Sequence, residues 1–299
     1  MFETLRNFWR VAKPGIIFAN LISTAGGFCL ASRGRIDSPL LAWTLTGMAL
    51  MVASACVFNN WIDRDIDQKM ARTRHRVLAQ GRMSSTAAII FGTLLGAAGA
   101  TLLLLRTNGI TLAAVLSGFA VYVGLYSLYL KRASGHAVVI GSLAGAAPPV
   151  AGYCTASGCF DPGALLLAVI FSLWQIPHAY AIAVLRREEY AAAGIPVFAV
   201  RRGAKTAKRH IVGYIIAFQA AALMLALGRY AGYTYFAVVA TVGLLWLILA
   251  LQGFHTTDEH RWARNVYAFS ILMVTILSVM MSVDAVNPLN TNLLLSYLP

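Results

Sequence analysis

Long apolar runs recur along this chain, and their length constrains its fold more than any other feature. A helix needs about 20 apolar residues to cross a bilayer, and open strands cannot cross, because their edge amides would stay unpaired in lipid. The runs predict nine membrane-spanning helices, over residues 16–32, 40–58, 86–105, 110–130, 137–156, 163–184, 211–228, 232–254 and 266–285. We therefore predict an all-α, polytopic membrane protein with a single integral-membrane domain, residues 1–299.

The composition agrees with this class. Only 12% of the residues are charged, about half the share of a typical soluble domain, and the mean hydropathy is +0.70. The first 15 residues are too short for a targeting peptide and are interpreted as an interfacial segment, with Phe8 and Trp9 at the lipid headgroups.

The placement of cations predicts the orientation. With nine helices, all but four Lys and Arg residues fall on the side of the N-terminus; the exceptions are Arg33, Arg35, Arg106 and Arg229. The positive-inside rule then places the N-terminus in the cytoplasm and the C-terminus outside. Although the net charge is +13, the cations follow the topology and do not form one soluble basic face, so nucleic-acid binding is not expected.

Four cysteines are present, and they do not form a zinc motif. Cys29 and Cys56 fall inside predicted helices. Cys154 and Cys159 flank a predicted outward loop, where a disulfide is chemically permitted.

The stretch NNWIDRDIDQKMARTRHR, residues 59–76, places acids at the edge of an apolar helix. Residues four apart share one helix face, so Asn59, Asp63 and Asp67 form a row about 12 Å long. Asp65 points roughly the opposite way. Oxygen ligands on one stripe suit Mg²⁺, which binds one or two carboxylates and completes its shell with water and phosphate.

Three arginines, Arg72, Arg74 and Arg76, follow this row and suit a phosphate bridged by the metal. The alternative is a solvated helix end with ion pairs such as Asp65 to Lys69. Carboxylates at membrane edges are costly and usually functional, which favours the site for metal and diphosphate.

With its continuation to Gly81, the acidic stretch resembles the first aspartate-rich motif of the UbiA superfamily of intramembrane prenyltransferases. Similar stretches extend over nearly the whole chain: KPGIIFANLISTAGGF (13–28), LKRASGHAVVIGSLAGAAPPVAGY (130–153), WQIPHAYAIAVLRREEYAAAGIPV (174–197) and WARNVYAFS (262–270). WQIPH followed by AGIPV is typical of the heme-farnesylating branch, and it differs from the aspartate ladder of the quinone-making relatives.

The resemblance implies nine helices around a central cavity that binds a prenyl diphosphate through Mg²⁺. It assigns the metal and catalytic roles of the first motif to Asn59, Asp63 and Asp67. Diphosphate contacts are expected from Arg72, Arg76, Lys131 and the adjacent Arg132.

The second acidic motif is less regular. Glu189 stands where the branch usually has aspartate, and with Glu188 it is the candidate for further metal binding; the alternative is pairing with Arg186 and Arg187. One or two Mg²⁺ ions both fit this pattern.

His178 lies in an apolar run directly after Pro177, which is expected to bend its helix. This imidazole is predicted to bind heme through its iron or a propionate, the alternative being a hydrogen-bonded core histidine. Pro148 and Pro149 are expected to break the fifth helix, and Gly141 and Gly145 to allow close packing there.

The resemblance implies that farnesyl diphosphate, heme b and water give heme o and diphosphate, with heme b a substrate and Mg²⁺ the cofactor. The other expected partners are the lipid bilayer and a downstream heme a synthase or terminal oxidase. Three alternatives remain. They are a related enzyme with an aromatic or quinone-precursor acceptor, a secondary transporter, and a non-catalytic heme chaperone, which has no need of the acidic row.

Overall fold

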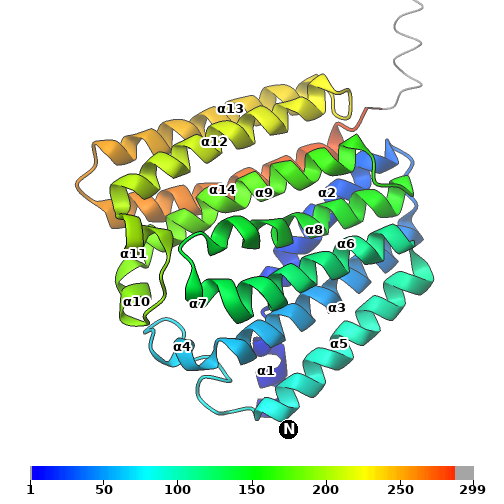
Figure 1. Ribbon diagram of the computed structural model, residues 1–299. Helices are drawn as coiled ribbons and strands as arrows, with labels where there is room; N and C mark the ends of the chain where they lie inside the picture. The colour runs from blue at the N-terminus through cyan, green and yellow to red at the C-terminus, as the bar shows by residue number, and fades with distance from the viewer. Residues whose placement is uncertain (1, 287–299) are drawn as a thin grey trace, which may run out of the picture.

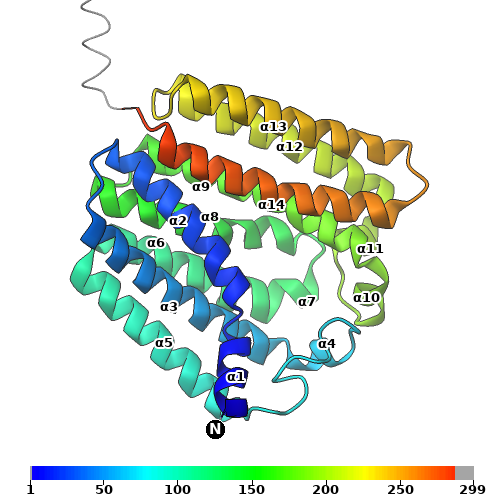
Figure 2. The ribbon, with the colours of Figure 1, turned by 180° about the vertical axis from the view of Figure 1, so that it is seen from behind.

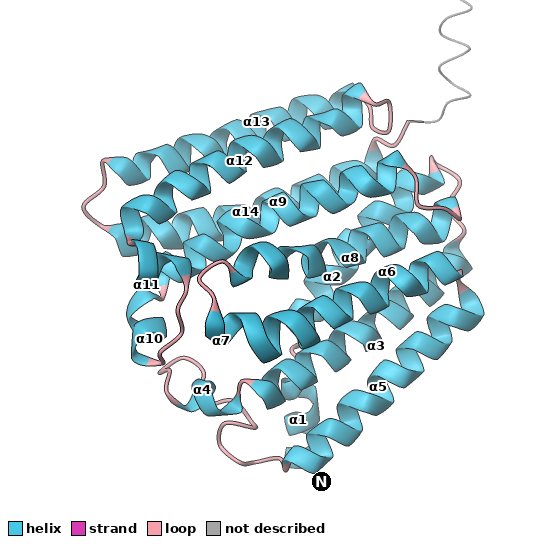
Figure 3. Ribbon diagram, viewed as in Figure 1, coloured by secondary structure: helices cyan, strands magenta, loops and turns pink. Residues whose placement is uncertain are grey.

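The computed structural model describes residues 2–286 and is built almost entirely of helices (Figure 3). In chain order these are α1 (Phe2–Val11), α2 (Pro14–Ser32), α3 (Ser38–Ile62), α4 (Arg64–Gln68), α5 (Ser85–Arg106), α6 (Gly109–Phe119), the π-helix η1 (Ala120–Leu130), α7 (Lys131–Ala133), α8 (Ala137–Ser157), α9 (Pro162–Leu185), α10 (Arg187–Ala192), α11 (Phe198–Arg202), α12 (Ala204–Leu227), α13 (Tyr233–Leu251), the 3₁₀-helix η2 (Gln252–Phe254) and α14 (Glu259–Val283).

Within residues 2–286, nine helices are long and apolar enough to cross a membrane, which confirms the predicted number. Two of them begin seven residues earlier than predicted: α12 at Ala204 and α14 at Glu259. Their first turns carry basic residues, including Lys205 and Arg261, which an apolar window excludes although they are good helix formers. The predicted placement of the C-terminus concerns residues outside the described range.

Short polar side chains start several of these helices. The Asp37 carboxylate accepts a hydrogen bond from the Leu40 N–H at 2.9 Å, and Ser84, Asn108 and Asp161 cap α5, α6 and α9 in the same way. Each cap satisfies an amide that has no partner within the helix. The long helices lie side by side, and α4, α7, α10 and α11 gather at one end of them (Figures 1 and 2).

The N-terminal segment is a helix, α1, with exposed Phe2, Leu5 and Trp9 on its surface. Phe8 instead packs edge-on against Phe91, with ring centroids 4.7 Å apart. The interfacial position predicted for both aromatic residues therefore suits Trp9, while Phe8 joins α1 to α5.

The predicted break of the fifth helix at Pro148 and Pro149 is wrong, whereas the bend predicted at Pro177 stays a prediction. Pro148 and Pro149 lie within the continuous α8, and Pro177 lies within the continuous α9. Cys154 lies in α8 and is buried, whereas Cys159 is exposed, and both thiols are free. The predicted loop between these cysteines thus begins later than expected, and no disulfide joins them.

Glycines set the distance between α2 and α8. A Cβ atom on Gly27 would collide with the carbonyl oxygen of Pro149, and one on Gly152 with that of Thr24. Gly141 and Gly145 allow close packing, as predicted, because Tyr126 and Gln175 fill the space that their side chains would take. Small residues of this kind let helix backbones approach closely within a membrane.

The contact at Gly152 predicts a difference between two Gly→Ala variants. Gly152→Ala is expected to destabilise the protein by about 1–3 kcal/mol, because overpacking forces the helices apart. Gly213→Ala on α12 meets open space and should be neutral or stabilising, by up to about 1 kcal/mol. Thermal unfolding of the purified proteins in detergent measures both, and equal melting temperatures would contradict the packing at Gly152.

Candidate functional site

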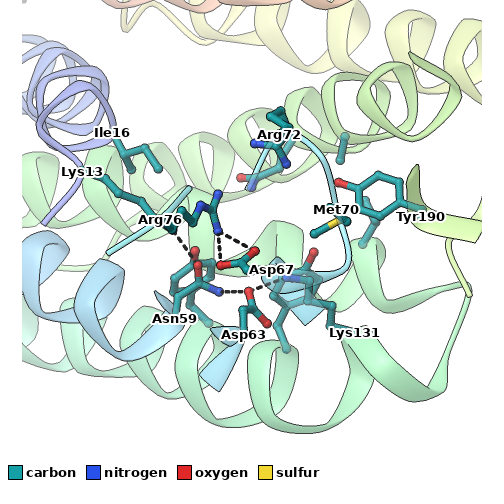
Figure 4. Close-up of a pocket in the computed structure, with 16 residues that line it drawn as sticks. Lys13, Ile16, Asn59, Asp63, Asp67, Met70, Arg72, Arg76, Lys131 and Tyr190 are labelled. Atoms are coloured by element: carbon teal, nitrogen blue, oxygen red, sulfur yellow. Dashed lines mark hydrogen bonds and ion pairs between the residues drawn. The ribbon is translucent and has the colours of Figure 1, made fainter. Parts of the chain in front are cut away.

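A cavity of about 260 Å³ opens where the ends of several helices meet (Figure 4). It lies at the end of the long helices near α4, α7 and α10 (Figure 1). Its lining comes from segments far apart in the sequence: Lys13, Ile16, Asn59, Asp63, Asp67, Met70, Arg72, Arg76, Tyr122, Tyr126, Lys131, Val138, Gly141, Gln175, Ala179 and Tyr190.

The acidic row forms one side of this cavity. α3 ends at Ile62, but the helical hydrogen-bond pattern continues across the junction with α4. The Asp63 N–H donates to the Asn59 carbonyl at 3.0 Å, and the Asp67 N–H donates to the Asp63 carbonyl at 2.8 Å. The three side chains keep the predicted spacing of one turn and are almost fully buried. The structure brings Asn59, Asp63 and Asp67 together at one cavity.

Cationic side chains from three other segments contact this row (Figure 4). The Lys131 ammonium donates a short hydrogen bond to Asp63, and Arg76 donates to both oxygens of Asp67, at 3.0 and 2.8 Å. A buried carboxylate is stable as an ion only with such partners. Both acids therefore carry a paired negative charge inside an apolar bundle.

Two features of the cavity leave binding capacity unused. Asp63 Oδ1 is buried and accepts no hydrogen bond from the described residues, although buried polar atoms are normally satisfied. The cavity lining also carries two carboxylates against four cations, because Arg72 and Lys13 join Arg76 and Lys131. The orphaned oxygen suits a cation, and the excess positive charge suits a polyvalent anion beside it.

Lys13 lines the cavity, although the charge pattern of the sequence predicts only the side of the membrane on which it lies. Its ammonium donates to Asn59 Oδ1 at 2.8 Å, while the Asn59 amide nitrogen donates to Asp63 at 2.8 Å. Burial, reinforced by the nearby Arg76, lowers the pKa of Lys13 to about 8. The sequence carries one indication of this position. Proline often occupies the first position of a helix, so Pro14 places Lys13 at the start of α2.

Tyrosines and a π-helix complete the cavity. Tyr122 and Tyr126, one turn apart on η1, line it with stacked rings, and Ser127 of η1 accepts a hydrogen bond from Asn59 at 3.2 Å. π-Helical turns are rare and frequently lie at functional sites. The i,i+4 tyrosine pair was visible in the sequence, but the π-helix that positions it was not.

Arg132 does not line the cavity, contrary to the predicted diphosphate contact. It donates to both oxygens of Asp65, at 2.7 and 2.6 Å, and to the Ile62 carbonyl. These hydrogen bonds lower the pKa of Asp65 to about 2. Asp65 faces away from the cavity, as predicted, but its partner is Arg132 and not Lys69, because α7 brings Arg132 beside the end of α3.

The second acidic motif also lies apart from the first. Glu188 is exposed, and Glu189 pairs with Arg186 at 3.1 Å, as the alternative interpretation held. Neither glutamate lines the cavity, and the described residues contain no group of three or more His, Cys, Asp or Glu placed to hold a metal. The turn between α9 and α10 directs the next residue, Tyr190, into the cavity instead.

His178 lies on α9 near the cavity but is not part of its lining. Its Nδ1 is 2.7 Å from the hydroxyl of Ser270 on α14. The imidazole packs against the rings of Trp174 and Tyr267, with centroid separations of 4.9 and 5.1 Å. The structure therefore separates His178 from the acidic row and places it at the contact between α9 and α14.

Residues 20–277 match the model of the UbiA prenyltransferase family. The chain belongs to this family. It is 55% identical over 292 residues to the protoheme IX farnesyltransferase of Klebsiella pneumoniae, covering 98% of this chain and 99% of that protein.

Solved structures of the family share this fold. The chain is similar to digeranylgeranylglyceryl phosphate synthase, with a TM-score of 0.78 at 17% identity over 95% of this chain and 99% of that one. It is also similar to a UbiA homologue from Archaeoglobus fulgidus bound to GPP and Mg²⁺, with a TM-score of 0.67 at 16% identity over 93% of this chain and 100% of that one.

The backbone conformation of Lys13 predicts that its replacement by glycine stabilises the free protein but weakens anion binding. Lys13 has φ 55° and ψ 68°, a left-handed conformation that costs a non-glycine residue about 1 kcal/mol or more. Lys13→Gly is expected to raise the melting temperature without ligand, since it relieves this strain and removes a half-buried cation whose partner is a neutral amide. It should also weaken the stabilisation of the protein by inorganic diphosphate with Mg²⁺.

Arg33→Gly is the matched control. Arg33, at the other end of α2, is exposed and has φ 47° and ψ 46°, so its replacement relieves similar strain without touching the cavity. Differential scanning fluorimetry compares the two variants. Equal protection of both by diphosphate would exclude Lys13 from the anion site.

Proposed function

We propose that this protein transfers the farnesyl group of farnesyl diphosphate to a vinyl group of heme b, with addition of water, giving heme o and diphosphate. Support comes from the 55% identity over almost the whole length of a protein named protoheme IX farnesyltransferase. WQIPH and AGIPV, residues 174–178 and 193–197, are present where quinone-making relatives carry an aspartate ladder.

The observation that carries the proposal is the pair of buried carboxylates, Asp63 and Asp67, set among four cations at the end of an apolar bundle. The orphaned Asp63 Oδ1 and the hard oxygen donors of the row fit Mg²⁺. We expect Asn59, Asp63 and Asp67 to hold the metal. It would then act on the bound diphosphate as a Lewis acid. A structural neighbour bound to GPP and Mg²⁺ supports this choice of ligands.

The protein's own cations supply the remaining stabilisation of the leaving group. Cleavage of the allylic C–O bond transfers negative charge to the diphosphate, and Arg72, Arg76, Lys131 and Lys13 surround the place where this charge develops. Fixed cations in a water-poor cavity stabilise such charge more strongly than they do in bulk water. Asp67 and Asp63 already draw Arg76 and Lys131 to this cavity, so the two cations need to move little when they exchange a carboxylate for the diphosphate.

Exclusion of water is the second requirement. An allylic cation exposed to bulk water would be trapped as farnesol, so the reaction needs a dry and apolar chamber. Besides its charged residues, the cavity is lined by Tyr122, Tyr126, Val138 and Ala179. The vinyl group attacks the farnesyl carbon, and one water then adds to the resulting cation on the porphyrin side. The added water loses one proton, which the diphosphate leaving group can accept, so no side chain is required as a general base.

The acceptor is expected to bind on the His178 side of α9. Gln175 and Ala179 on this helix line the cavity, and His178 lies between them in the sequence. An acceptor heme held by His178 would therefore lie within about one helical turn, 5.4 Å, of the donor site along the helix axis. Glu188 and Glu189 lie outside the cavity lining, so α10 would have to move before they could hold a second metal.

The competing functions make different demands on the site. An aromatic or quinone-precursor acceptor would leave His178 without a role, and a heme chaperone would not need the acidic row. Transporter sites lie near the midplane, whereas this cavity lies at the ends of the helices. Mass spectrometry of the product separates the acceptors.

We place the protein in the bacterial inner membrane with the cavity mouth and the N-terminus in the cytoplasm, because the cations concentrate on that side. The proposed reaction leaves the methyl groups of the porphyrin unchanged. The product is therefore expected to pass either to a heme a synthase, which would oxidise a methyl group, or directly to a terminal oxidase.

Amide variants of the acids test the catalytic proposal. Asp63→Asn and Asp67→Asn are expected to lower heme o formation at least about 100-fold, because each removes a charge that holds the metal and orders a cation. Asp65→Asn is the matched control: its side chain is 56% exposed and faces away, so the activity should stay within a few-fold of wild type. Membranes supplied with farnesyl diphosphate and heme b provide the assay. Normal activity of both the Asp63 and Asp67 variants would refute the proposal.

Removal of divalent metal should abolish turnover reversibly. Purified protein treated with EDTA is expected to form no heme o and to recover on addition of Mg²⁺. Ca²⁺ should restore less activity, because it is larger and prefers more ligands than this row provides. Undiminished activity after chelation, with metal analysis showing that none remains, would exclude a metal-dependent mechanism.

A further inference from the structure

We propose that Ser270 is a positioning residue for the acceptor: it holds the imidazole of His178 with Nε2 free to bind the heme iron. This inference rests on the proposed function, because the heme that His178 would bind is the acceptor of that reaction. Its hydroxyl group lies on α14, in a segment that contributes no residue to the diphosphate cavity.

The proton of the Ser270 hydroxyl decides the tautomer of His178. A serine hydroxyl has one proton to donate and two lone pairs. The Ser270 hydroxyl donates that proton to the Tyr267 carbonyl oxygen of its own helix. At the 2.7 Å contact with His178 Nδ1, Ser270 is therefore the acceptor and Nδ1–H is the donor. A neutral imidazole protonated at Nδ1 carries its lone pair on Nε2.

No side-chain or backbone group of residues 2–286 is hydrogen-bonded to Nε2, and because the side chain is half-buried, this nitrogen is not enclosed in the contact between the helices. A histidine enclosed between two helices would satisfy both ring nitrogens. Neutral imidazole with one N–H anchored and the other nitrogen bare is instead the state in which histidine binds metals, and the anchoring partner sets the orientation and basicity of the ring.

Aromatic neighbours fix the ring in the same orientation. Trp174 lies one turn before His178 on α9, and its Nε1–H donates to the Ser270 backbone carbonyl at 2.8 Å. Tyr267 covers another side of the ring. The hydroxyl and the carbonyl of Ser270 thus bind one side chain each from a single face of α9, so that rotation of His178 would break contacts on both helices.

The location suits the acceptor. A helix turns about 100° per residue, so His178 lies about 60° from Gln175 and about 100° from Ala179, both of which face the cavity. A heme whose iron is bound by Nε2 would lie beside the farnesyl chain. Its vinyl group must reach C1 of that chain, the carbon bonded to the diphosphate, so donor carbon and vinyl group meet where the diphosphate cavity adjoins α9.

Heme titration without farnesyl diphosphate provides the test. The purified protein is titrated with heme b, and ligation is measured by the Soret band, by electron paramagnetic resonance of the ferric form, and by the iron–histidine stretch of the ferrous form in resonance Raman spectra. Wild type is expected to show histidine ligation. His178→Ala should lose it, and added imidazole should restore an imidazole-ligated spectrum.

Three serine variants separate positioning from structure. Ser270→Ala is expected to shift the iron–histidine stretch and weaken heme binding about 10-fold or more, as loss of an outer-shell partner does at other metal sites. Ser270→Cys, which keeps a weak acceptor, should fall between Ala and wild type. Ser278→Ala is the matched control, because Ser278 is equally buried on α14 and its hydroxyl donates to its own helix at Val274. It should resemble wild type.

Two results would overturn the inference. Unchanged ligation in His178→Ala would exclude this imidazole as the iron ligand, and a Ser270→Ala spectrum and affinity equal to wild type would exclude the role of Ser270. Melting temperatures identify any variant that fails to fold. If Ser270→Ala does not fold, the spectrum and heme affinity of Ser270→Cys decide whether Ser270 has this role. Heme o formation by wild type is measured separately. If wild type forms heme o while either result holds, only the inference fails; if it forms none, the proposed function fails.

Discussion

The site depends on two ion pairs of buried carboxylates with partly exposed cations, Asp63 with Lys131 and Asp67 with Arg76. An isolated carboxylate inside an apolar bundle would be too costly to keep ionised, so each acid needs a cation brought from elsewhere in the chain. Arg76 comes from the loop after α4, where the Thr73 hydroxyl donates to the Asp67 carbonyl at 3.0 Å. The loop therefore folds back over the end of α3.

The packing of the bundle serves the same arrangement. Gly27 and Gly152 bring α2 against α8, and the N-terminal end of α2 carries Lys13 to Asn59. The π-helix η1 places Ser127 beside the same asparagine, and its continuation α7 carries Lys131. Asn59 is thus contacted from two further helices, and its amide is oriented before any ligand binds. Preorganisation of this kind lowers the entropy lost on binding.

The helices and the acidic row could be predicted because both depend on local periodicity. Apolar runs and the four-residue spacing of Asn59, Asp63 and Asp67 are properties of one segment at a time. Lys13, Gln175 and η1 were missed because their places depend on how distant helices pack. The same limit explains the error at Arg132: Lys131 and Arg132 are adjacent in sequence, but neighbouring residues on a helix point about 100° apart, and only one faces the cavity. Glu189 pairs with Arg186 for a comparable reason, since the turn into α10 directs Tyr190 inward.

The cations that hold the acids in the free protein are also the groups that a diphosphate needs. If Mg²⁺ binds Asp63 and Asp67, the carboxylates have less negative charge to share with Lys131 and Arg76, and a diphosphate can take their place as partner. The number of ionic contacts is then conserved while the partners exchange, so binding does not leave a buried charge unpaired. Lys13 is expected to gain most from the bound diphosphate. Its present partner is the neutral amide of Asn59, and a charged phosphate oxygen would be a stronger partner. The strained backbone that holds it at the cavity is understandable on the same basis, as strain retained where a ligand is to be bound.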